Sequence, residues 1–129
     1  MGTAPIPGRG MIQILLVEDN DMFRQAFVRL LERKPDMEVV AQASSLEETR
    51  GKLSGVDVAI IDRGLPDGDG LDLIGELRQA SPGAAVLVLS LTLEHAHPRV
   101  ALEAGADEVL DKLAPHGEIT SAIHRVAGG

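Results

Sequence analysis

Five polar residues stand at the ends of short apolar runs, and the three carboxylates among them are of the kind that binds a metal ion. Glu18 and Asp19 follow the first run, Asp62 and Ser90 follow two later runs, and Lys112 follows the last. If the three carboxylates converge, their like charges repel one another, and a hard divalent cation with oxygen ligands relieves that repulsion. Magnesium is the natural candidate. Taken singly, a carboxylate after a strand is more often a helix cap or a solvated loop residue.

The elements that position these residues follow from the hydrophobic pattern. Apolar runs without alternation, such as ILLV at 14–17 and VLVL at 86–89, indicate strands buried on both faces, while the segments between them have a helical period. The pattern predicts strands and helices in strict alternation, over 12–17, 21–33, 38–42, 45–53, 57–62, 70–80, 85–90, 97–104, 108–111 and 117–126.

Boundary residues agree with this division. Asn20 or Asp21 is expected to cap the first helix, and Ser45 with Glu48 has the spacing of a capping box for the second. Gly105 suits the left-handed position after the fourth helix. These signals mark where the first and second helices begin and where the fourth ends.

Alternation of strands and helices implies right-handed crossovers and a three-layer α/β sandwich. We expect the flavodoxin-like (βα)5 fold with a parallel sheet in the order 2-1-3-4-5, in which ligands bind where the strand order reverses, beyond the carboxyl ends of the first and third strands. That edge would bring Glu18, Asp19 and Asp62 together, with Ser90 and Lys112 beside them.

Composition excludes several other classes. The chain has 129 residues, no cysteine, a net charge of -8 and Phe23 and Phe27 as its aromatic residues. It therefore has room for one domain, forms no disulfide, and is not expected to bind nucleic acid directly. No apolar stretch reaches the length of a membrane span and the start lacks a signal peptide, so we expect no membrane association and a cytoplasmic location. Residues 1–10, rich in Gly and Pro, are predicted to be a disordered tail before a domain over 11–127.

The motifs around these residues resemble the receiver domain of bacterial two-component response regulators. They are ILLVEDN at 14–20, DRGLPDGDGLDLI at 62–74, VLVLS at 86–90 and ALEAGADEVLDK at 101–112. The resemblance covers 11–127, and the last portion is most similar to receivers of the NarL type. It identifies the chain as a phosphoacceptor signalling domain rather than an enzyme, apart from self-catalysed aspartyl phosphorylation and dephosphorylation.

The resemblance assigns a role to each residue. It implies that Asp62 is the phosphoacceptor and that Glu18, Asp19, Asp62 and the backbone carbonyl of Gly64 hold Mg²⁺. Lys112 would bind one phosphoryl oxygen and the Ser90 hydroxyl would donate to another, which gives the phosphorylated state contacts of its own.

The resemblance also implies partners. A sensor histidine kinase would donate the phosphoryl group, and the conformational change would control an output, which in NarL-type proteins is transcription through a C-terminal LuxR-type helix-turn-helix domain. No such domain lies within this chain. A homodimer is the further assembly that the resemblance suggests.

Four positions depart from the family pattern. Arg63 stands where an apolar residue commonly follows the phosphoacceptor, Leu91 replaces a small residue after the switch hydroxyl, Val109 replaces an aromatic switch residue, and Leu113 replaces a proline. Leu91 and Val109 favour an alternative function, an atypical receiver that serves as a phosphorylation-independent interaction module. A phosphatase of the haloacid dehalogenase type is set aside, because its general acid two residues after the nucleophile would be Gly64.

Overall fold

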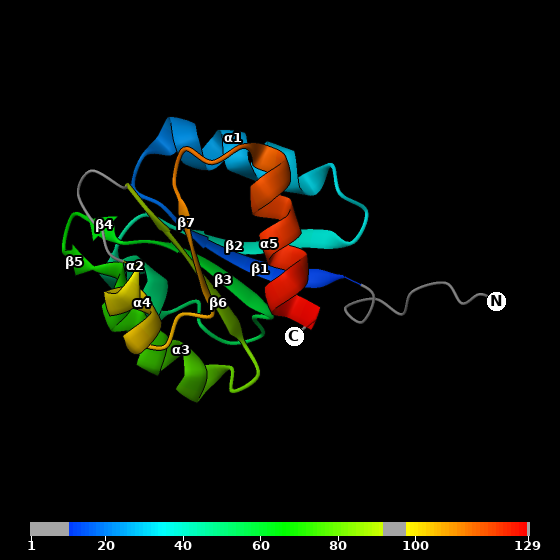
Figure 1. Ribbon diagram of the computed structural model, residues 1–129. Helices are drawn as coiled ribbons and strands as arrows, with labels where there is room; N and C mark the ends of the chain where they lie inside the picture. Colours follow the sequence, from blue (N-terminus) through cyan, green and yellow to red (C-terminus); the bar gives the residue numbers. More distant parts are fainter. Residues whose placement is uncertain (1–10, 92–97, 129) are drawn as a thin grey trace.

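The computed structural model describes residues 11–91 and 98–128, and within them a parallel sheet is covered by helices on both faces (Figure 1). The sheet consists of β1 (Ile12–Val17), β2 (Met37–Ala43), β3 (Val58–Asp62), β6 (Ala85–Ser90) and β7 (Glu108–Asp111), in the order β2-β1-β3-β6-β7. All of its pairings are parallel. Since β6 and β7 are the fourth and fifth strands of this sheet, the predicted flavodoxin-like fold and the strand order 2-1-3-4-5 are confirmed.

Side chains of the central strands divide between the two faces because successive residues of a strand point to opposite sides. Ile14, Leu16, Ile60 and Leu87 pack in one cluster with α1 (Asp21–Glu32) and α5 (His116–Gly128). Leu15, Val17, Ile61 and Val88 pack in a second cluster with α2 (Leu46–Arg50), α3 (Leu73–Ala80) and α4 (Arg99–Glu103). This explains why the strands read as continuous apolar runs: both faces of the sheet are buried.

A small hairpin after β3 was not predicted. The strands β4 (Gly64–Leu65) and β5 (Gly68–Asp69) pair antiparallel, and a 3-10 turn, η1 (Gly70–Asp72), leads from them into α3. The predicted helix over 70–80 is therefore shorter and begins at Leu73. Strands of two residues have no periodicity to read, which is why the pattern did not reveal them.

Several helices begin or end at other residues than the sequence predicted. Asn20 caps α1 by accepting a hydrogen bond from the Phe23 backbone N–H at 2.9 Å. The second helix ends at Arg50 rather than 53, with Gly51 as its C-cap, and α5 begins at His116. The fourth helix begins at Arg99, and the expected start at residue 97 lies outside the described residues, as does the predicted tail over 1–10.

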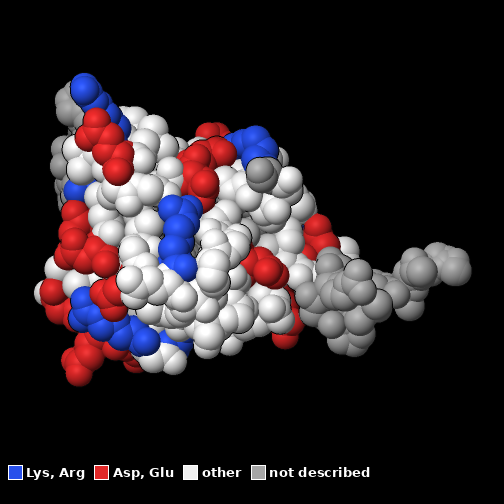
Figure 2. All heavy atoms as spheres, turned by 90° about the horizontal axis from the view of Figure 1, so that it is seen from below, with Lys and Arg blue, Asp and Glu red and all other residues white. Residues whose placement is uncertain are grey.

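The face formed by α2, α3 and α4 carries charges of both signs. In Figure 2, which looks onto the molecule from below, acidic and basic side chains lie mostly in mixed groups. The ion pairs of α3 account for part of this arrangement: Arg50 pairs with Glu76, and Arg78 pairs with Asp107. No helix within the described ranges is long and apolar enough to cross a membrane.

Candidate functional site

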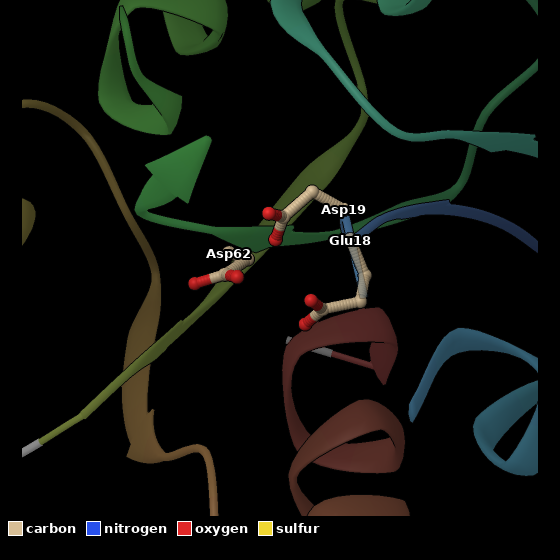
Figure 3. A group of neighbouring side chains, drawn as sticks. All are labelled: Glu18, Asp19 and Asp62. Carbon is tan, nitrogen blue, oxygen red and sulfur yellow. The ribbon is translucent and has the colours of Figure 1, made fainter. Parts of the chain in front are cut away.

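Three carboxylates meet at the carboxyl edge of the sheet, where β1 and β3 end. Oxygens of Glu18, Asp19 and Asp62 all lie within 4.8 Å of one another, and Figure 3 shows the three carboxyl groups turned toward a common space. Glu18 and Asp62 are buried, whereas Asp19 is exposed. An all-oxygen set of this kind suits a hard divalent cation.

Glu18 is held in place by the backbone around it. Its N–H donates to the Ala43 carbonyl at 2.9 Å, and its carboxylate accepts from the Asn20 N–H at 2.9 Å. Arg24 of α1 donates to the Glu18 carbonyl at 2.9 Å and to the Gln42 side chain at 3.2 Å. The ends of β1 and β2 are thereby tied to the first helix, which fixes one wall of the site.

Lys112 is the counter-ion of the two buried carboxylates. Its Nζ lies 3.0 Å from Oε1 of Glu18 and 3.1 Å from Oδ2 of Asp62. The same ammonium lies 5.0 Å from the centroid of the Phe23 ring, within the range of a cation–π interaction. No motif in the sequence indicated this contact.

Burial and hydrogen bonding shift the ionisation of this group of residues. Burial raises the pKa of Glu18 to about 7, although the Asn20 N–H and Lys112 oppose the shift. For Lys112 burial disfavours the charged form, but the hydrogen bonds to Glu18 and Asp62 outweigh it and raise the pKa of the ammonium. Lys112 therefore stays charged at neutral pH and carries a positive charge beside Asp62.

Ser90 lies on β6, the strand next to β3. Asp62 pairs with Leu89 in the sheet, so Ser90 is one residue beyond the level of Asp62, and its carbonyl accepts from the Lys112 N–H at 3.0 Å. The Ser90 hydroxyl is buried and has no hydrogen-bond partner among the described residues. An unsatisfied buried hydroxyl is costly, and in a site it indicates a group prepared for a ligand.

The loop after Asp62 approaches the site closely. The Gly64 N–H donates to Oδ1 of Asp62 at 3.2 Å, and Gly64 is exposed. A Cβ at Gly70 would lie 2.3 Å from the Asp62 carbonyl oxygen and 2.6 Å from the Ile61 side chain. Only glycine fits at position 70, which explains the glycine that follows Asp69 in the motif.

The four departures from the family pattern occupy different surroundings. Arg63 forms an ion pair with Asp69 of the hairpin at 2.7 Å, and Val109 packs against the core cluster beneath α2, α3 and α4. Leu91 is half-buried just beyond β6, and Leu113 is exposed.

Comparisons with known proteins agree with this geometry. Residues 14–124 match the response regulator receiver domain family. The chain is 38% identical over 121 residues to the transcriptional regulatory protein UhpA of Salmonella typhimurium, covering 92% of this chain and 60% of that protein. It is 31% identical over 121 residues to the transcriptional activator DevR/DosR of Mycobacterium tuberculosis, covering 92% and 56%. The chain thus spans no more than about 60% of the length of these relatives.

Solved structures are similar as well. A LuxR-family response regulator from Aurantimonas sp. SI85-9A1 superposes with a TM-score of 0.82 at 29% identity, over 92% of this chain and 86% of that one. The signal receiver domain of a response regulator NarL from Mycobacterium tuberculosis superposes with a TM-score of 0.76 at 28% identity, over 92% and 98%. These likenesses support the NarL/LuxR-type subgroup.

Proposed function

The chain belongs to the response regulator receiver domain family of two-component signalling, and on that premise we propose that Asp62 accepts a phosphoryl group from a sensor histidine kinase. The observation that carries the proposal is the pairing of buried Asp62 with Lys112, beside the Ser90 hydroxyl, which has no hydrogen-bond partner in the described part of the chain. Signalling of this kind makes the domain a switch rather than a classical enzyme.

The transfer follows from the surroundings of Asp62. An oxygen of its carboxylate attacks the phosphorus of the kinase's phosphohistidine, so that a new O–P bond forms while the N–P bond breaks and the histidine nitrogen leaves with the electron pair. The Gly64 N–H holds the other carboxylate oxygen at 3.2 Å. Lys112 then pairs with one phosphoryl oxygen and Ser90 donates to another, since both stand next to Asp62.

The donor set also fits a magnesium ion. Glu18, Asp19 and Asp62 would hold it together with the backbone carbonyl of Gly64, and these donors are all oxygens, as Mg²⁺ prefers. When bound, the ion neutralises charge that develops on the phosphoryl oxygens during transfer. Lys112 supplies a single positive charge against three carboxylates, which leaves negative charge in the cluster to attract a cation.

The switch would act through Ser90 and β6. The Ser90 hydroxyl, which has no hydrogen-bond partner within 11–91 and 98–128, gains one when Asp62 carries a phosphoryl group, and the two states then differ in their contacts. Val109 has no aromatic ring to rotate, so the signal would pass through Ser90 and β6. Hydrolysis of the acyl phosphate within the protein itself would return the domain to its starting state.

The output and the partners are part of the same proposal. The relatives UhpA and DevR/DosR are transcription regulators, and the matched region is only part of each. We propose that this domain controls transcription through a helix-turn-helix domain outside the chain, with a homodimer as the assembled form. Because the kinase would take its phosphoryl group from ATP, we also propose a cytoplasmic location for the domain.

Intact mass spectrometry after incubation with acetyl phosphate tests the proposal. We expect one phosphoryl group per chain with Mg²⁺, little in chelator, and none in Asp62→Ala. Asp36→Ala is the matched control, because Asp36 lies at the opposite end of the sheet and pairs with His124. The same mass gain in Asp62→Ala would refute the assignment. No mass gain in the wild type would favour the alternative, an interaction module independent of phosphorylation.

A further inference from the structure

Arg63, which directly follows Asp62, reaches across the β4–β5 hairpin. Its Nε lies 3.3 Å from Oδ1 of Asp69 and its Nη2 lies 2.7 Å from Oδ2, so the guanidinium binds the carboxylate with two hydrogen bonds. The Arg63 side chain is 13% exposed. A two-pronged pair of this kind fixes direction as well as distance, which a single charge contact does not.

The pair links Arg63, which precedes Gly64 in the chain, to Asp69, which lies opposite Gly64 in the hairpin. The Arg63 guanidinium therefore binds the cross-strand neighbour of Gly64. The Arg63 carbonyl accepts from the Leu65 N–H at 3.1 Å and from the Gly70 N–H at 3.0 Å. Both strands of the hairpin are thereby tied to Arg63.

Arg63 itself is anchored to the sheet. Its backbone N–H donates to the Leu89 carbonyl at 3.2 Å, which continues the β3–β6 ladder by one bond. Asp69 also accepts from the Leu71 N–H at 3.0 Å and so begins the 3-10 turn. Through Arg63 the sheet therefore holds in place a hairpin whose strands have only two residues each.

We infer that Arg63 is a positioning residue for the cation site, which acts by clamping the β4–β5 hairpin through Asp69 and so holding the Gly64 carbonyl toward the carboxylates. This inference rests on the proposed function, because it takes the Gly64 carbonyl as a metal ligand. Partners that orient a ligand in this way typically change metal affinity by about 10–100-fold when removed.

Electrostatics alone predicts the opposite change in Mg²⁺ affinity. Replacing Arg63 by methionine removes a positive charge next to the cluster. The site becomes more negative, and Coulomb attraction would then strengthen cation binding. A weaker affinity can therefore come only from lost positioning.

The test measures Mg²⁺ affinity by isothermal titration calorimetry with the full chain. We expect the dissociation constant to rise about tenfold in Arg63→Met, the lower end of the range for such partners because the pair is partly exposed. Arg63→Lys keeps the charge and one hydrogen bond, so we expect a rise of about threefold, on the order of half that effect in free energy. Arg50→Met is the control, since Arg50 forms an ion pair with Glu76 away from the site, where its Nε donates to both carboxylate oxygens.

Backbone amide exchange followed by nuclear magnetic resonance supplies a second readout. The Leu65 and Gly70 amides, which donate to the Arg63 carbonyl, should exchange faster in Arg63→Met, while those of the central strands stay protected. In an Asp69→Asn background Arg63→Met should add little further loss of affinity, because the two residues act as a unit.

Outcomes of this test separate the two proposals. If the wild type binds Mg²⁺ and Arg63→Met binds it equally well or more tightly, the positioning role is wrong and the proposed function stands. If the wild type binds no Mg²⁺, both fail. Should Arg63→Met lose stability, the Arg63→Lys variant and the exchange of the two hairpin amides still decide the question.

Discussion

Removing the charge of Asp62 should stabilise the metal-free protein. Asp62→Asn keeps the shape of the side chain and its ability to accept from the Gly64 N–H, but it removes one of three carboxylates from a cluster served by one lysine. The measurement belongs at pH 8 in chelator, since Glu18, whose pKa is about 7, is then ionised and repels Asp62.

The size of the effect follows from the distances. With an effective dielectric constant of about 20, the attraction between Asp62 and Lys112 at 3.1 Å is worth about 5 kcal/mol. Under the same assumption the repulsion between Asp62 and Glu18, at no more than 4.8 Å, costs at least about 3.5 kcal/mol. Exposed Asp19 adds a smaller, screened repulsion.

Because the attraction to Lys112 and the repulsion from the other carboxylates nearly cancel, the cost of burying the Asp62 charge decides the sign of the change in stability. Its side chain is 7% exposed, and removing the charge avoids the cost of taking it out of water. Lys112 also keeps Glu18 as its partner in the variant. We therefore expect the free energy of unfolding to increase by about 1 kcal/mol, the usual size of a single-site change. For a domain of this size that corresponds to a rise in Tm of roughly 4 °C.

Thermal melts followed by far-UV circular dichroism measure the change, because the chain has no Trp or Tyr for fluorescence. At a concentration of 100 Kd, Mg²⁺ should add about 2.7 kcal/mol to the free energy of unfolding of the wild type and so raise its Tm. The rise in Tm should be smaller for Asp62→Asn. Glu38→Gln on the exposed face of β2 makes the same change in net charge away from the site. It should change neither the Tm in chelator nor the rise in Tm with Mg²⁺. If Asp62→Asn is less stable than the wild type in chelator and Mg²⁺ shifts neither protein, the reasoning is refuted.

Three further substitutions test the same site. Lys112→Met leaves Glu18 and Asp62 buried without their counter-ion, so its free energy of unfolding should fall by about 3 kcal/mol in chelator at pH 8 and partly recover with Mg²⁺. An unchanged melt in chelator would contradict the counter-ion role. Gly70→Ala places a Cβ 2.3 Å from the Asp62 carbonyl oxygen, and urea unfolding should show a loss of about 3 kcal/mol. Its control, Gly75→Ala in α3, meets open space and should gain roughly 0.5–1 kcal/mol. Leu91→Ala opens the half-buried position after Ser90, and time courses by intact mass should show faster loss or uptake of the phosphoryl group. Identical time courses for the two proteins would mean that Leu91 points away from the site.

Local pattern determined the elements that the site requires. The central strands were predictable because both of their faces are buried, so every residue of β3 and β6 is buried. The strand order 2-1-3-4-5 was expected as a common order for alternating strands and helices, and it placed Glu18, Asp19 and Asp62 at one edge. These inferences need a period, a chain direction and a common strand order.

Contacts between distant segments decided the rest. The second helix was predicted to reach residue 53 but ends at Arg50. Its start is held by Asp67 of the hairpin, whose carboxylate accepts from the Leu46 and Glu47 N–H groups. The capping box was also wrong in detail, since Ser45 accepts from the Glu48 N–H while the Glu48 carboxylate accepts from Ser44 instead. Both cases turn on which acceptor lies nearest in space.

The electrostatics of the site is the clearest case. The sequence by itself determined which residue types reach the carboxyl edge, because each follows its own strand. It could not determine that Lys112 would bridge Glu18, 94 residues away, and Asp62, 50 residues away, or that burial would raise the pKa of Glu18 to about 7. Desolvation and charge pairing depend on distances of a few ångströms between segments far apart in the chain, and only the tertiary structure sets those distances.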